Sequence, residues 1–296
     1  MQAFKTFVTF LLLSMLTPTT QAQQSVSVLF PYAAGSSTDL AVRKMADQLS
    51  GKDFNYTVIP TPGAAGLVAI NVLINSQSRA VAVIGNGLLT FKDIDIVKDI
   101  RPVVLIGYEP TVIAVRADSP YQNLRDLHEA ARTKPIYYGS SGVGSYGHYS
   151  SSIVANRNAN IVHVPFRSTG QAVPELLSGR LDFLVMDETL IDRFVKSGQV
   201  RPIAANYHRR LLSFPNVATF AEQGVDNKNF YRWEIVVAKP DTDPKIIAQI
   251  QAYFNDPAVR NELTKINIRP ENVQLDTFIQ MQQQIMESVK RDFVVP

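Results

Sequence analysis

The stretch SVSVLFPYAAGSSTDLAVRKM, residues 25–45, joins an apolar run to an amphipathic segment through a turn of small residues. Residues 25–30 are predicted to form a short strand, and residues 38–50 a helix with apolar side chains at helical spacing. Glycine and hydroxyl residues fill the turn between them. The stretch therefore predicts a strand that leads directly into a helix, which is the repeating unit of α/β folds.

Strand-like and helix-like segments alternate along most of the chain. Strands at 56–59 and 80–84, with a helix at 66–75 between them, complete a βαβαβ start that implies a parallel sheet covered by helices. Further strands are expected at 103–108, 111–115, 136–139, 161–165, 181–186, 200–205 and 233–238. Further helices are expected at 124–133, 146–156, 170–178, 245–255, 258–266 and 277–293.

The order of these segments indicates an α/β fold with two lobes, each a mainly parallel sheet flanked by helices. We interpret the polar segment 116–123 as the crossing between domains and the strand at 233–238 as the return. Lobe 1 is expected to comprise residues 23–118 and 236–296, and lobe 2 residues 119–235. A cleft between two such lobes favours the binding of a small molecule.

Composition excludes several classes of protein. The 296 residues are 46% hydrophobic and 19% charged, which is typical of a globular chain of two domains. The net charge of +3 is spread along the sequence, so no basic cluster indicates a nucleic-acid surface. Without cysteine, the chain cannot form disulfides, thiolate nucleophiles or cysteine-ligated metal sites.

The N-terminus has the three parts of a secretory signal peptide. A cationic start is followed by an apolar run at residues 7–16 and by small residues at Thr20 and Ala22. A membrane anchor is the alternative, but the run is about half of the roughly 20 residues that cross a bilayer. We expect cleavage after Ala22 and export to a bacterial periplasm.

Two strand-to-helix turns, one in each half, carry the chemistry. Residues 31–39 and 139–148 both place glycine and hydroxyl residues where a helix begins. A helix start offers unpaired amide groups and the positive end of the helix dipole, so it can bind an anion. Ser36, Ser37 and Thr38 also fit simple helix caps. The occurrence of matching turns in both halves favours a ligand-binding role.

The second turn permits one other interpretation. Gly142, Gly144 and Gly147 satisfy G-x-G-x-x-G, and Arg167 lies about 20 residues later, as an NADP-binding oxidoreductase would allow. The serine-hydrolase elbow is absent, because Val143 stands where glycine is required. The sequence therefore offers no nucleophilic serine.

Four other side chains are candidates for the cleft or for structural roles. His148 lies in the first turn of its helix, where it either donates to a ligand or covers the turn. Asp187 and Glu188 follow the strand at 181–186, so they either face a ligand at its carboxyl end or form a solvated loop. Arg167 either faces the cleft or forms a structural ion pair. The histidines show no metal-ligand spacing, and no metal or cofactor is expected.

The chain resembles the receptors of tripartite tricarboxylate transporters, also called the Bug family. The resemblance rests on the signal peptide, on the turns at 31–39 and 138–145, and on four shorter segments at 62–66, 162–166, 177–182 and 214–217. It extends over nearly the whole mature chain. Ser36 and Ser37 stand where the family usually has glycine, and Arg167-Ser168 where it usually has lysine-glycine.

The resemblance implies a type II-like periplasmic binding protein that is not an enzyme. It would capture a small organic carboxylate between the two turns, as a monomer, and deliver it to membrane permease subunits. A ligand-binding sensor is also compatible with the sequence. The implied contact residues are Tyr32, Ala33, Ser36, Ser37, Thr38, Asp39, Ser140, Ser141, Val143, Gly144 and Ser145, to which our own analysis adds His148, Arg167 and Asp187.

Overall fold

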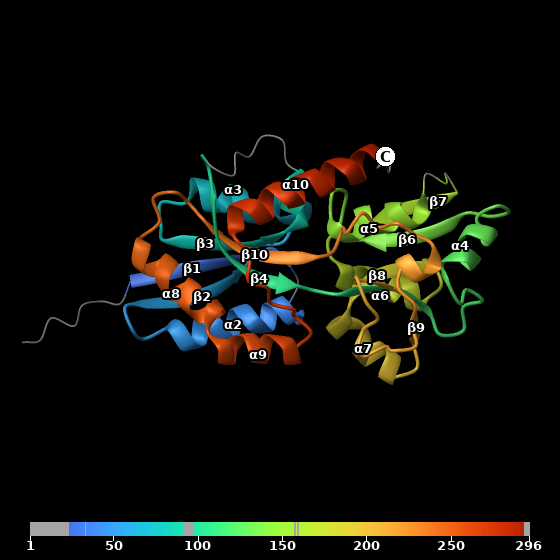
Figure 1. Ribbon diagram of the computed structural model, residues 1–296, viewed down its shortest axis with the longest axis horizontal. Coiled ribbons are helices and arrows are strands. Elements are labelled where there is room, and N and C mark those ends of the chain that lie inside the picture. Colours follow the sequence, from blue (N-terminus) through green and yellow to red (C-terminus); the bar gives the residue numbers. More distant parts are fainter. Residues whose placement is uncertain (1–23, 33, 91–97, 157, 159, 293–296) are drawn as a thin grey trace, which may run out of the picture.

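Two five-stranded mixed sheets, each flanked by helices, form the two halves of the chain (Figure 1). The computed structural model describes residues 24–32, 34–90, 98–156, 158 and 160–292. The predicted signal peptide and Ala33 lie outside the described residues. Within the described part, no helix combines the length and the apolar character that crossing a membrane requires.

The first sheet has the strand order β2-β1-β3-β10-β4. Its strands are β1 (Gln24–Phe30), β2 (Phe54–Pro60), β3 (Ala80–Gly85), β4 (Arg101–Tyr108) and β10 (Trp233–Ala238). β1 runs parallel to β2 and β3, whereas β10 is antiparallel to β3 and β4. One face packs against α2 (Ser37–Leu49), α8 (Pro244–Asn255) and α9 (Pro257–Lys265), and the other against α3 (Leu67–Asn75) and α10 (Leu275–Asp292). Two short 3-10 helices, η1 (Ala64–Gly66) and η2 (Asn86–Thr90), lie in its loops.

The second sheet has the strand order β7-β6-β8-β5-β9. Its strands are β5 (Thr111–Arg116), β6 (Ile136–Ser140), β7 (Ile161–Pro165), β8 (Phe183–Asp187) and β9 (Val200–Asn206). β6 is parallel to β7 and β8, and β5 is antiparallel to β8 and β9. α4 (Leu124–Ala130) and α5 (Tyr146–Ala155) cover one face, while α6 (Thr169–Leu177) and α7 (Glu188–Lys196) cover the other. The short η3 (Ala221–Gln223) precedes the return to the first sheet.

The chain passes between the sheets earlier than the sequence predicts. The boundary expected at residue 118 would leave β5 in the first lobe, whereas β5 pairs with β8 and β9. Only Glu109 and Pro110 separate β4 from β5, so the crossing is a two-residue extended link. The polar segment 116–123 is instead the loop that follows β5. The expected return at 235/236 likewise falls inside β10.

α7 and α10 depart from the expected arrangement. The sequence gives no helix at residues 188–196, where the structure has α7. α10 packs on both halves: Phe278 and Ile279 join the cluster that contains Trp233, whereas Met286 and Val289 join the core of the second half. Figure 1 shows α10 running from the first half toward the second, where the chain ends. The C-terminal helix therefore connects the two halves.

Candidate ligand-binding site

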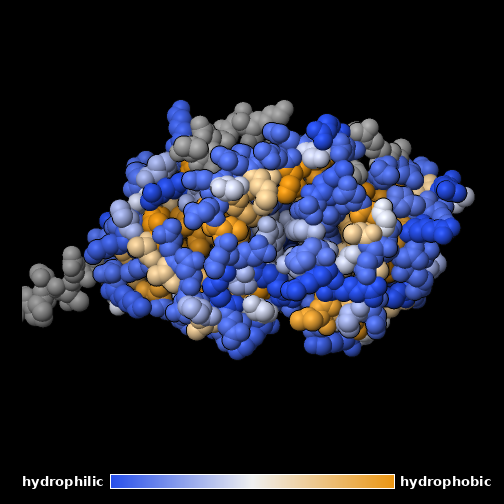
Figure 2. All heavy atoms as spheres, viewed as in Figure 1, coloured by the Kyte–Doolittle hydropathy of each residue, from blue (hydrophilic) through white to orange (hydrophobic). Residues whose placement is uncertain are grey.

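A cavity of about 140 Å³ lies between the two halves. In the space-filling view, hydrophilic side chains border the recess where the halves meet (Figure 2). Both halves contribute to its lining, which includes Pro31, Tyr32, Ala34, Gly35, Ser36, Gly63, Ala65, Asn86, Gly87, Thr111, Ser141, Ser145, Tyr146, Gly147, Arg167, Ser168, Thr169, Gly170, Val185, Asp187, Leu190, Arg193, Arg232 and Glu234.

The turn before α2 brings Tyr32 and Ser36 to the cavity. Ser36 is the N-cap of α2, because its hydroxyl accepts a hydrogen bond from the Asp39 amide at 3.1 Å. Asp39 in turn accepts from the Gly35 amide at 3.0 Å and forms an ion pair with Arg43. The Asp39 carboxylate therefore holds the turn closed and is not part of the cavity lining.

The hydroxyls of Ser37 and Thr38 are occupied by protein partners. The Ser37 hydroxyl lies 2.5 Å from the Thr189 hydroxyl of α7, and Thr38 donates to the buried carboxylate of Glu109. As the first two residues of α2, Ser37 and Thr38 still have amides without partners inside the helix. Any contribution of these residues to a ligand must come from the main chain.

The second turn brings Ser141 and Ser145 to the cavity and keeps other predicted residues away from it. Ser145 caps α5, since its hydroxyl accepts from the His148 amide at 3.2 Å. The Ser140 hydroxyl bonds the His163 ring at 2.7 Å, and the Gly144 amide donates to His148 Nδ1 at 3.1 Å. Ser140, Gly144 and His148 are absent from the lining, as is Val143, whose side chain is 59% exposed.

His148 supports the turn from behind. It is fully buried, and its ring stacks on that of His163 with a centroid separation of 4.0 Å. Burial and the neighbouring His163 lower the pKa of His148 to about 3, and burial lowers the pKa of His163 to about 4. Both rings are therefore neutral at physiological pH, which lets His148 Nδ1 accept the Gly144 hydrogen bond.

Two further helices begin at the cavity, and their caps differ in charge. α6 is capped by Ser168, whose hydroxyl accepts from the Gln171 amide at 3.3 Å, and Arg167 lies beside this start. α7 is capped by Asp187, whose carboxylate accepts from the Leu190 amide at 2.7 Å. A carboxylate cap neutralises the positive end of a helix, whereas a serine cap leaves it available to an anion. Serine also caps α2 and α5, so three helix starts with neutral caps face one cavity.

The sequence allows Glu188 either to face a ligand or to lie in a solvated loop, and the structure shows neither. It is buried, and its carboxylate pairs with Arg269 of the first half at 3.2 Å. Arg167, by contrast, lines the cavity with an exposed side chain. The first turn of α7 therefore ties the two halves together, while Arg167 provides positive charge at the cavity.

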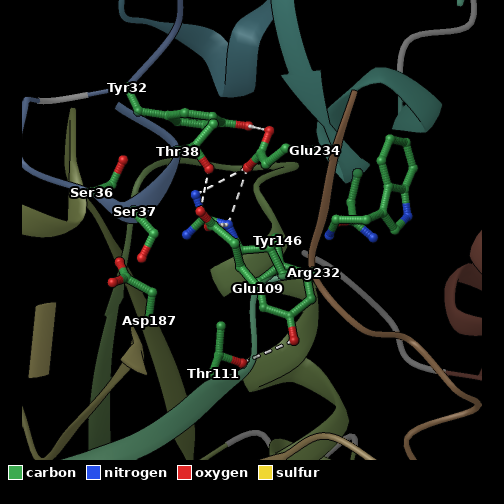
Figure 3. Close-up of polar contacts among 12 residues, drawn as sticks. Tyr32, Ser36, Ser37, Thr38, Glu109, Thr111, Tyr146, Asp187, Arg232 and Glu234 are labelled. Atoms are coloured by element: carbon green, nitrogen blue, oxygen red, sulfur yellow. Dashed lines mark hydrogen bonds and ion pairs between the residues drawn. The ribbon is translucent and has the colours of Figure 1, made fainter. Parts of the chain in front are cut away.

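A charged cluster that the sequence does not predict lies at one side of the cavity. Arg232 forms ion pairs with Glu109, at 2.9 Å, and with Glu234, at 3.1 Å (Figure 3). Tyr32 donates to the second oxygen of Glu234 at 3.0 Å, and its ring lies 5.2 Å from the Arg232 guanidinium. The sequence signal for this cluster is the pair of charged residues on either side of Trp233, at the start of an otherwise apolar strand.

Burial dominates the electrostatics of the cluster. It raises the pKa of Glu234 to about 8, although the positive charge of Arg232 opposes the shift. Burial also raises the pKa of Glu109, again against the effect of Arg232. Among the described residues, no group of three or more His, Asp or Glu side chains is placed to hold a metal ion.

The chain is similar to a protein family, to curated relatives and to solved structures. Residues 43–293 match the family model described as "Tripartite tricarboxylate transporter family receptor". A UPF0065 protein of Bordetella bronchiseptica is 28% identical over 268 residues, covering 84% of this chain and 79% of the relative. An R. palustris structure with adipate has a TM-score of 0.81 at 21% identity, covering 92% of this chain and 97% of that one. The periplasmic binding protein BugD has a TM-score of 0.79 at 20% identity, covering 91% and 97%.

Proposed function

The chain belongs to the family of tripartite tricarboxylate transporter receptors, and we propose that it captures a small organic carboxylate in the cavity between its halves. The observation that carries the proposal is the convergence of three serine-capped helix starts on one cavity that both halves line. The adipate in a structure of the same fold supports the class of ligand.

The available interactions are strong enough for capture. Each helix start stabilises an anion by about 0.3–2 kcal/mol, and each hydrogen bond to a charged group contributes roughly 1.5–3 kcal/mol. Four or five such bonds and three helix starts give about 7–21 kcal/mol in total, and the upper part of this range covers the roughly 8 kcal/mol of a micromolar complex together with the costs of association. The proposed donors are the amides of Ser37, Thr38 and Gly147 and the side chains of Ser36 and Ser141. Ser145 and Arg167 complete the proposed contacts.

The cavity volume supports a small ligand. A cavity of about 150 Å³ in another protein accommodates benzene, and the present cavity measures about 140 Å³. A nicotinamide dinucleotide is several times larger than benzene, so this volume disfavours the NADP-binding alternative. The proposed ligand is therefore an acid of a few carbon atoms.

The remaining parts of the proposal concern location and partners. We propose that residues 1–22 are removed on export, that the mature monomer works without catalysis in the periplasm, and that the ligand passes to permease subunits. The two halves would act as lobes that close on the ligand, with their links at Glu109–Pro110 and just before Trp233. The two-sheet arrangement and the solved structures of the same fold support this assignment.

A thermal-shift screen tests the function. Mature protein, residues 23–296, would be melted with a panel of mono- and dicarboxylates, with the neutral amide of each acid as its control. A ligand at 100 times its Kd adds about 2.7 kcal/mol of stability, which raises Tm by several degrees. Stabilisation by at least one acid and not by its amide is expected. Stabilisation by NADP alone, or by no carboxylate, would contradict the proposal.

A further inference from the structure

The main chain on both sides of Arg232 is firmly held. Asn86 donates to the carbonyl of Tyr231 at 3.0 Å and accepts from the Trp233 amide at 3.2 Å. The Glu109 amide donates to the carbonyl of Arg232 itself at 3.0 Å. The side chain of Arg232 therefore extends from a backbone that is held by Asn86 of η2 and by Glu109 of the β4–β5 link, at the point where the chain returns to the first sheet.

Nε and Nη2 of the Arg232 guanidinium contact buried glutamates, whereas Nη1 does not. Nε lies 2.9 Å from Glu109 Oε2 in an ion pair whose direction does not suit a hydrogen bond, and Nε and Nη2 both donate to Glu234 Oε1. Nη1 donates to none of the residues that the structure describes, and it is not among the fully buried atoms without a partner. The side chain is 16% exposed and lines the cavity. A guanidinium has five N–H donors, so donors remain for a ligand.

The charges around Arg232 do not balance while both glutamates are ionised. Glu109 and Glu234 are 3% and 1% exposed, and they share a single guanidinium. Hydrogen bonds from Thr38 and Tyr32 satisfy one oxygen of each carboxylate. A net negative charge in a buried cluster is costly, so one carboxyl group retains its proton. Burial raises the pKa of both glutamates, that of Glu234 to about 8, and we place the proton on Glu234 against the Tyr32 hydroxyl, which lies 3.0 Å from Oε2.

The other groups that face this cluster come from both halves. Glu234 of β10 interacts with Arg232, which directly precedes that strand, with Tyr32 from the turn before α2 and with Glu109 from the β4–β5 link. The charge of Asp187, at the end of β8, raises the pKa of Glu109 and of Arg232. The charge of Arg232 also reaches the Tyr146 hydroxyl at the start of α5, whose pKa it lowers against the larger effect of burial. Figure 3 shows Arg232 between the Tyr32 side and the Tyr146 side of the site.

We infer that Arg232 is a fixed cation that contacts the carboxylate of the ligand, and that the proton on Glu234 determines whether the cluster accepts this anion. The inference rests on the proposed function. With Glu234 protonated, the cluster of Glu109, Arg232 and Glu234 is neutral, and Nη1 attracts an anion. With Glu234 ionised, the cluster carries a net negative charge and repels it. At a pH above the pKa of Glu234, the binding of a carboxylate is therefore coupled to the uptake of one proton by Glu234.

Calorimetric titration between pH 6 and pH 9.5 tests the inference, with a carboxylate found in the panel as the probe. For the wild type, affinity is expected to fall by about tenfold per pH unit above pH 8. Near pH 8, the binding heat should depend on the ionisation heat of the buffer, because a proton is taken up. Glu234→Gln should bind equally well across the range and show no proton uptake.

Two matched controls come from the other buried ion pair. Glu188 is 1% exposed and pairs with Arg269, but neither residue lines the cavity. Glu188→Gln should keep the pH dependence of the wild type.

Arg232→Lys keeps a charge but loses the planar fork, so roughly 10- to 150-fold weaker binding is expected at pH 7. Arg269→Lys keeps the charge of its pair, and Arg269 does not line the cavity, so affinity should fall far less than it does for Arg232→Lys.

The possible results separate the inference from the proposed function. If the wild type binds a carboxylate with equal affinity from pH 6 to pH 9.5, or if Glu234→Gln keeps the pH dependence, the inference is wrong and the receptor function stands. If no carboxylate binds at any pH, the proposed function itself fails. Should Arg232→Lys unfold, as circular dichroism would reveal, the comparison of Glu234→Gln with Glu188→Gln still decides.

Discussion

Acidification should destabilise the fold through the two stacked histidines behind the second turn. His148 is fully buried, its ring lies 4.0 Å from that of His163, and its Nδ1 accepts a hydrogen bond from the Gly144 amide. The perturbation is a fall in pH from 7 to 4.5. A proton on Nδ1 would place two donors against each other in the turn that carries Ser145.

The sign and size follow from the pKa values of the two histidines. Burial lowers the pKa of His148 to about 3 in the folded state, whereas an unfolded histidine titrates near 6.5. The stabilising contribution is complete above pH 6.5 and is lost as the pH falls, because the unfolded chain takes up the proton first. At 1.36 kcal/mol per pH unit, the loss from His148 at pH 4.5 is about 2–3 kcal/mol. His163 is partly exposed, so solvent reduces its contribution.

Urea unfolding at pH 7, 5.5 and 4.5 measures this loss, with His148→Asn as the matched control. The asparagine oxygen can accept the Gly144 hydrogen bond but does not titrate. Carboxylates elsewhere affect both proteins equally, so the difference between them isolates His148. The midpoint of the wild type should fall more steeply with acid than that of the variant. Parallel pH profiles for the two proteins would refute the reasoning.

Three further predictions concern single residues of the cavity. Ser145→Ala removes the cap of α5, and a denaturant titration should show a loss of about 1 kcal/mol. Gly87→Ala places a methyl group against the Ala65 carbonyl, so the backbone of the cavity lining must move. Calorimetry should then show carboxylate binding weakened by more than tenfold. Unchanged affinity would mean that the lining tolerates this movement. Asp187→Asn keeps a helix cap but removes a charge, so stability should change by less than about 0.5 kcal/mol while carboxylates bind a few-fold more tightly. Weaker binding would show that the Asp187 charge assists the ligand.

Local patterns predict most elements but not their assembly. The strands around 25–30 and 80–84 and the helix after Ser36 follow from spacing and caps that lie within a few residues. The segment that forms α7 has an amphipathic pattern, with apolar residues at positions 190, 191, 194 and 195, but it is only nine residues long. It follows β8 without an intervening loop, so its first residues are easily mistaken for a loop after the strand. β5 is recognisable as a strand, but an apolar strand does not encode which sheet it joins. Pairing with β8 and β9 decides that through tertiary contacts.

The same distinction applies to the site. The turns at 31–39 and 139–148 are visible in the sequence because serine caps and glycine turns are local chemistry. The roles within each turn are not visible, since the partners of Thr38 and Ser140 lie 71 and 23 residues away. Arg232 and Glu234 gain their significance only when burial brings Glu109 against them.

Under the proposed function, the start of α2 would link ligand binding to the contact between the halves. Its first residue, Ser37, has an amide without a partner inside the helix and a hydroxyl that lies 2.5 Å from Thr189 of α7. Thr189 also donates to the carbonyl of Ile266, and its neighbour Glu188 pairs with Arg269. Separation of the halves would therefore open the cavity and break these polar contacts together. Because a ligand held by α2 and α5 adds bonds that exist only when the halves meet, its binding energy favours the closed arrangement over the open one.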